Sequence, residues 1–217
     1  MLLDFRTSIW YLFMILISVG NIYLWVRYFE WTFQGYLSGL YTMVCALRSI
    51  FPRVDLERVV LIDSFPSSIF LGRSLATIAE VAFAIQVADF FGCPMIINLI
   101  LVAQCFCWLS VLTLVPLFHI IEESLWALSA IVLMKIENIY FTLPYALYMI
   151  LVDVPMYIQK FKKWDGRYLY LREGLRNSIL VRFPKRTWDY WKQEYLWMTL
   201  YFSIGVWASQ YMMIFSF

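Results

Sequence analysis

The length, composition and charge of the chain exclude a soluble globular protein. Its 217 residues are 63% hydrophobic and 15% charged, whereas soluble domains hold about 45–50% apolar and about 25% charged residues and must cover their surface with polar groups. The net charge of +2 is too small to indicate binding of nucleic acid, so the lipid bilayer is the expected partner.

We expect an all-α protein, a single membrane domain of apolar helices joined by short loops. A helix needs about 20 apolar residues to cross a bilayer core. The first apolar run is interpreted as a spanning helix rather than a signal peptide, because Asp4 accompanies Arg6 in front of it and signal peptides begin with a positively charged region. In chain order the apolar runs cover residues 8–26, 31–47, 66–91, 94–115, 118–134, 139–157 and 195–215.

The second run, residues 31–47, leaves the number of spanning helices open between seven and six. It is short and contains polar side chains, yet Gly35 and Gly39, four residues apart, allow two helices to approach closely. If this run crosses the membrane there are seven helices, and the chain ends lie on opposite sides. If it only dips into the membrane there are six, with both ends on one side. The apolar length and the paired glycines favour seven.

The polar stretch 159–193 predicts the orientation of the chain. It contains most of the Lys and Arg residues, and positively charged loops stay on the cytoplasmic side, or on the matrix or stromal side in an organelle. Within it, Leu171, Leu175 and Ile179 recur every four residues beside Arg172 and Arg176. This spacing predicts an amphipathic helix on the membrane surface with its basic face against anionic lipid headgroups. The alternative is a solvated helix in the loop.

Ionisable side chains inside the apolar runs are the candidate functional residues, because each costs about 2.5–3.5 kcal/mol to insert into a bilayer. Arg73 and Glu80 are seven residues apart and share one helical face. A second face, in the run 118–134, carries residues at positions i, i+3, i+4 and i+7. Either topology places these groups in the cytoplasmic half of the bilayer. The candidate residues are Arg73, Glu80, His119, Glu122, Glu123, Trp126 and Asp153.

We predict that these residues form one polar cluster open towards the cytoplasmic side. Arg73 would pair with Glu122 or Glu123, Asp153 would lie near the mouth, and Glu80 would lie deeper. As a catalytic site, the cluster would use Glu122, Glu123 and His119 as acid and base groups. Its substrate-binding residues would be Arg73, Glu80, Asp153 and Trp126. The alternative is a set of ion pairs that only fix the packing of the helices.

The sequence predicts no metal centre and does not identify a cofactor. The cysteines Cys45, Cys93, Cys105 and Cys107 lie in or beside apolar runs without zinc-ligand spacing, so we expect them to be buried small hydrophobic residues. The single histidine, His119, excludes a bis-histidine haem and argues against a di-iron centre, which takes a histidine from each of two helices. Phosphate-binding loops and hydrolase motifs are absent from the sequence.

Three functions remain open at this point. The first is a membrane-embedded enzyme or binding protein for a lipid or isoprenoid, in which a basic surface helix gathers anionic headgroups. The second is a structural subunit of a larger membrane complex, with other membrane proteins as partners. The third is a proton-linked transporter with Glu80 as the protonatable group, although no internal hydropathy repeat supports it.

Overall fold

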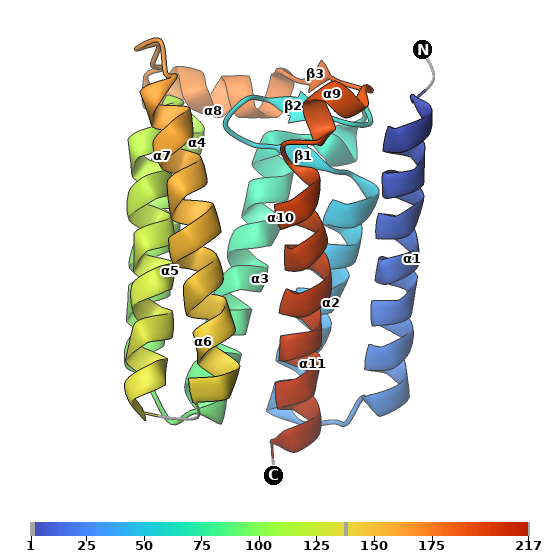
Figure 1. The fold of residues 1–217 in the computed structure, drawn as a ribbon, viewed down its shortest axis with the longest axis vertical. Coiled ribbons are helices and arrows are strands. Elements are labelled where there is room, and N and C mark those ends of the chain that lie inside the picture. The colour runs from blue at the N-terminus through green and yellow to red at the C-terminus, as the bar shows by residue number, and fades with distance from the viewer. Residues whose placement is uncertain (1–2, 137–138, 217) are drawn as a thin grey trace.

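The computed structural model describes residues 3–136 and 139–216 and is a bundle of long, roughly parallel helices (Figure 1). The prediction of a helical bundle is therefore confirmed. Two of the long helices are interrupted by a π-helical turn without any break in the helical run. These turns are η2 (Met149–Asp153) and η3 (Tyr201–Gly205). The long helices are α1 (Phe5–Tyr28), α2 (Phe33–Ile50), α3 (Ile69–Phe90), α4 (Met95–Thr113), α5 (Pro116–Ile136), α6 (Ile139–Tyr148) with α7 (Val154–Lys162), and α10 (Tyr195–Leu200) with α11 (Val206–Phe215).

Local signals in the sequence start and stop these helices. The Asp4 carboxylate accepts a hydrogen bond from the Thr7 amide at 2.8 Å, and the Thr32 hydroxyl accepts one from the Gly35 amide at 3.1 Å. Both are N-caps, which satisfy amides that have no partner inside the helix. Helix α4 ends at Leu114, which adopts a left-handed conformation with φ 63°. Since α5 begins only two residues later, α4 and α5 form a tight antiparallel pair.

Among the described residues, four helices are long and apolar enough to cross a membrane: α1, α3, α4 and the segment Pro116–Met134 of α5. On α1 the side chains of Leu12, Phe13 and Leu16 are more than half exposed. An apolar surface of this extent on a helical bundle is covered by lipid or by another protein. These features support an integral membrane protein.

Glycines bring α1 and α2 together, as the sequence predicts for Gly35 and Gly39. A Cβ atom on Gly39 would lie 2.5 Å from the Trp25 ring of α1, and one on Gly35 would lie 2.2 Å from the Glu30 carbonyl oxygen. Both distances are shorter than any van der Waals contact. The close approach of α1 to α2 therefore requires glycine at position 39, whereas glycine at position 35 makes room for the link between the two helices.

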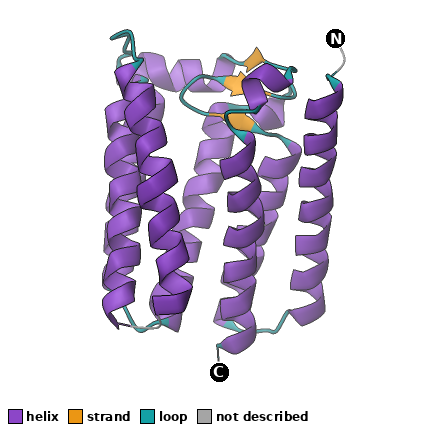
Figure 2. Cartoon of the chain, viewed as in Figure 1, coloured by secondary structure: helices purple, strands orange, loops and turns teal. Residues whose placement is uncertain are grey.

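The polar stretches of the sequence fold into a cap at the end of the bundle that also holds the N-terminus (Figure 1). Three two-residue strands, orange in Figure 2, form its centre, with β2 antiparallel to β1 and parallel to β3. An all-α expectation missed this small sheet, because pairs of residues carry no recognisable strand pattern. The cap consists of β1 (Arg53–Val54), β2 (Val59–Val60), the 3₁₀ turn η1 (Phe65–Ser67), α8 (Leu171–Leu180), β3 (Phe183–Pro184) and α9 (Trp188–Trp191).

Arg58 connects the cap to the bundle through hydrogen bonds of its side chain. Its guanidinium donates hydrogen bonds to the Val111 carbonyl of α4 at 2.6 Å and to the Asn177 side chain of α8 at 2.8 Å. Burial lowers the pKa of this guanidinium to about 10, which still leaves it charged at neutral pH. One buried cation thus joins three chain segments that are far apart in sequence.

The predicted surface helix is present as α8 and lies across the ends of α3 and α4 (Figure 1). Its buried residues are small: Gly174 and Ser178 face the protein, whereas Leu171, Leu175 and Ile179 are exposed. The apolar stripe that the sequence shows is therefore turned away from the bundle.

Replacing Gly174 with alanine should destabilise the protein by about 1–3 kcal/mol. A Cβ atom at this position would lie 1.8 Å from the carbonyl oxygen of Leu112, so α8 must move away from α4. The matched control is Gly20→Ala in α1, where no atom lies within 4 Å of the added Cβ. Thermal unfolding of both purified variants in detergent should show a loss for Gly174→Ala only; equal melting temperatures would contradict the packing described here.

Candidate functional site

Arg73 and Glu80 form a buried ion pair along one face of α3. The Glu80 carboxylate also accepts a hydrogen bond from the Tyr201 hydroxyl at 3.0 Å and lies 3.7 Å from the Arg48 guanidinium. The Arg73 guanidinium donates a second hydrogen bond, of 3.1 Å, to the side-chain oxygen of Gln104. This arginine–glutamate network joins α2, α3 and α4 to the helical run that begins at α10.

The prediction that Arg73 pairs with Glu122 or Glu123 is wrong. Two turns of helix separate Arg73 from Glu80, about 10.5 Å along the axis, and the arginine and glutamate side chains together span that distance along their own helix. The sequence places both residues on one face, and this intrahelical pairing follows directly from that spacing. Sequence analysis also missed Arg48, assigned to a loop but buried in the last turn of α2.

A second buried group consists of Cys107 on α4 and His119 and Glu122 on α5, called here the Cys–His–Glu cluster. The His119 Nδ1 atom lies 2.6 Å from a Glu122 carboxylate oxygen. Sulfur, nitrogen and oxygen atoms of the three residues all lie within 4.8 Å of one another, and each residue is at most 4% exposed. The cluster adjoins the arginine–glutamate network, because Gln104 and Cys107 are one turn apart on α4.

The geometry of the α4–α5 hairpin explains why Cys107 meets this pair. Cys107 lies seven residues before Leu114, and Glu122 lies seven residues after Val115. In a tight antiparallel pair of helices, residues at equal distance from the turn have equal depth. This symmetry about the turn is the signal in the sequence that could have identified Cys107.

The remaining predicted site residues are Glu123, Trp126 and Asp153, and they differ in burial and in the groups that they contact. Glu123 is half-buried on the same turn of α5. Asp153 lies in η2, and its Oδ1 atom is buried without a hydrogen-bond partner among the described residues. Trp126 packs against an apolar cluster that includes Ala84 and Ile100, so it is part of the hydrophobic core.

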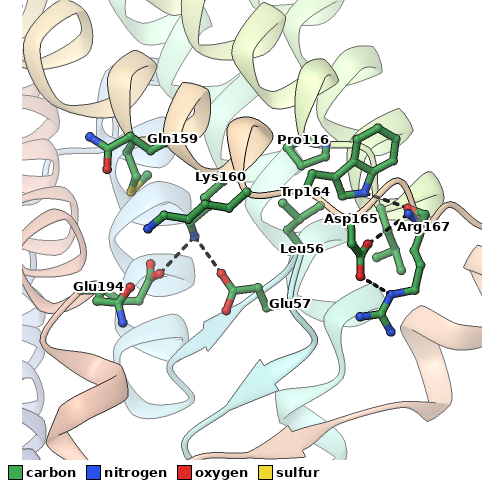
Figure 3. A pocket seen from close by; sticks show the side chains of 13 residues that line it. Leu56, Glu57, Pro116, Gln159, Lys160, Trp164, Asp165, Arg167 and Glu194 are labelled. Carbon is green, nitrogen blue, oxygen red and sulfur yellow. Dashed lines mark hydrogen bonds and ion pairs between the residues drawn. The ribbon is translucent and has the colours of Figure 1, made fainter.

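A pocket of about 530 Å³ opens at the cap end of the bundle (Figure 3). At its edge the Lys160 ammonium lies between two carboxylates, 3.1 Å from Glu194 and 3.3 Å from Glu57. The residues that line it come from α7 and the turn after it, the β1–β2 turn, the α4–α5 link and the segment before α10. They are Leu56, Glu57, Leu114, Pro116, Met156, Gln159, Lys160, Lys163, Trp164, Asp165, Arg167, Gln193 and Glu194.

Tyr157 connects this pocket to the Cys–His–Glu cluster. The centre of its ring lies 4.5 Å from the centre of the His119 ring and 5.6 Å from the ammonium nitrogen of Lys160. Pro116 lines the pocket, and His119 follows three residues later, about 4.5 Å deeper along α5. The buried cluster therefore lies about one helical turn below the pocket floor at Pro116, with the Tyr157 ring against His119.

Comparisons with protein-family models, with curated proteins and with solved structures gave no significant match. The function of this chain is therefore argued from its own residues.

Proposed function

We propose that this protein is a membrane-embedded enzyme that acts on a lipid or isoprenoid with an anionic headgroup. The observation that carries the proposal is the buried His119–Glu122 pair beneath a pocket whose lining includes Lys163. An ionisable pair this far from water is costly in a purely structural role. A pocket above a proton-transferring pair is the usual arrangement of an enzyme site.

The proposal includes seven spanning helices, with the cap on the cytoplasmic, matrix or stromal side. In support, α2 has 18 residues, about 27 Å in length, and runs antiparallel to α1 (Figure 1). The helical runs from Ile139 to Lys162 and from Tyr195 to Phe215 are each interrupted only by a π-helical turn. The basic residues of the cap favour its placement on the positive-inside face. This orientation puts the pocket at the level of the lipid headgroups.

Lys163 is the residue best suited to bind the headgroup. Lys160 is already neutralised by Glu57 and Glu194, and Arg167 pairs with its neighbour Asp165 at 2.6 Å. Lys163 is exposed in the same pocket and forms no ion pair with any residue in the described part of the chain. Its charge is therefore available to a phosphate or carboxylate group.

His119 and Glu122 would act as the acid–base pair. Glu122 holds Nδ1 of the imidazole at 2.6 Å, and this contact fixes the ring orientation. Arg73, by contrast, is engaged by Glu80 and Gln104. That arrangement favours a role for Arg73 in holding the helices together, and the anion is bound nearer to the surface.

Replacing Lys163 with alanine should weaken retention of the bound lipid about fivefold, since one basic residue near a membrane surface contributes about 1 kcal/mol to the binding of anionic lipid. Native mass spectrometry of gently extracted protein should show a lipid-mass adduct whose occupancy falls in this variant. The matched control is Lys185→Ala, which removes an exposed cap lysine outside the pocket. A bare wild-type protein, or an equal fall in both variants, would overturn the headgroup assignment.

A further inference from the structure

We propose that Cys107, His119 and Glu122 bind a divalent transition-metal ion, and that zinc is the ion their chemistry favours. Their ligand atoms already lie within 4.8 Å of one another. In a tetrahedral zinc site with bonds of about 2.0–2.3 Å, neighbouring ligand atoms are about 3.3–3.8 Å apart. Small side-chain rotations would therefore complete the ligand set without any movement of the backbone.

The positions of the three residues are fixed by rigid elements. His119 and Glu122 are one turn apart on α5, where side chains three residues apart are neighbours. Cys107 is held opposite them by the tight turn at Leu114. An ion between the three side chains would replace the 2.6 Å contact of His119 Nδ1 with Glu122, and each atom would contact the ion instead.

Charge balance also supports an ion at this place. A thiolate and a carboxylate together neutralise a divalent ion, so the loaded cluster carries no net charge inside the membrane. The nearest buried cation, Arg73, already has Glu80 as its counter-charge. Within the described part of the chain, the ion pair found for Glu122 is the one with His119.

The mixture of ligands distinguishes between classes of metal. Magnesium and calcium prefer oxygen ligands, whereas one sulfur, one imidazole nitrogen and one carboxylate oxygen suit zinc and its neighbours in the transition series. Three protein ligands leave a fourth position, as in catalytic rather than structural zinc sites.

This inference rests on the proposed function at the same site and changes one part of it: with the ion bound, His119 and Glu122 would serve as ligands rather than as a free acid–base pair, and zinc would supply Lewis-acid activation of water or of a substrate oxygen. It is tested by metal content, which does not depend on knowing the substrate. Protein purified in mild detergent from zinc-supplemented cells, without chelator, should contain about one zinc ion per chain. The variants Cys107→Ser and His119→Gln should retain at most about a tenth of that amount, while Cys105→Ser, an exposed cysteine two residues away, should retain all of it.

Cobalt substitution gives a second readout that does not depend on the stability of the variants. Wild-type protein loaded with Co²⁺ should show a near-ultraviolet thiolate-to-cobalt absorption band, and Cys105→Ser should keep it. Absence of zinc and of the cobalt band from folded wild-type protein, or equal metal content in folded Cys107→Ser, would overturn the site. Bound zinc without a lipid adduct would refute the lipid proposal alone, whereas a lipid adduct without metal would refute the zinc site alone.

Discussion

Replacing Glu80 with alanine will destabilise the protein by about 3–5 kcal/mol, because it leaves buried arginines without their carboxylate. Glu80 pairs with Arg73, lies 3.7 Å from Arg48 and accepts the Tyr201 hydroxyl. Glu80→Gln keeps a hydrogen-bond acceptor and should cost less than Glu80→Ala. Equilibrium unfolding of the purified protein in mixed micelles gives both free energies.

The matched control is Glu30→Ala, since Glu30 is an exposed carboxylate in the link between α1 and α2. An exposed substitution of this kind should change the free energy of unfolding by no more than about 0.5 kcal/mol. If Glu80→Ala were as stable as Glu30→Ala, the arginine–glutamate network would not be what holds α2, α3 and the α10 run together.

The contacts of Glu80 also bear on the transporter hypothesis. A carboxylate that takes up and releases a proton during transport must exchange its partners, whereas Glu80 is held by two arginines and a tyrosine. A proton-driven flux in liposomes that disappears in Glu80→Gln, with folding retained, would favour the transporter over the enzyme. We expect no such flux.

Replacing Glu122 or His119 with glutamine will reduce turnover about 10²–10⁴-fold, the usual contribution of a positioned acid or base. Lipids extracted from cells that express wild-type protein should contain a product that falls to background in either variant. The two losses should not add in the double variant, since the 2.6 Å contact makes the residues one functional unit.

Ser124→Ala serves as the control for that experiment, because Ser124 is exposed on α5 and hydrogen-bonds only within its own helix among the described residues. Unchanged lipids in cells expressing Glu122→Gln, compared with wild type, would refute the enzyme. Stoichiometric co-purification of partner proteins with an unaltered lipid profile would instead support a structural subunit of a membrane complex.

The sequence by itself determined the helices to within a few residues. Predicted runs 66–91, 94–115 and 195–215 correspond to the observed Ile69–Phe90, Met95–Thr113 and Tyr195–Phe215. Hydrophobicity over about 20 residues is a local property, and caps such as Asp4 and turns such as Leu114 are local too. The burial of Arg73, Glu80 and Glu122 was predictable for the same reason, since an ionisable residue in an apolar run is visible without any tertiary contact. The buried arginines Arg48 and Arg58 lie outside the predicted runs and were missed.

Only the tertiary structure decided which side chains meet. The contact of Arg48 from α2 with Glu80 and the approach of Cys107 to His119 depend on helix rotation and depth, and small-residue contacts between helices set these. The pocket is lined by four segments that are distant in the chain, so no local sequence pattern predicts it. Hydrophobicity does not reveal which side chains contact each other, because lipid and protein interiors are equally apolar. The sequence therefore predicted polar groups inside the apolar runs, and helix packing determined their neighbours.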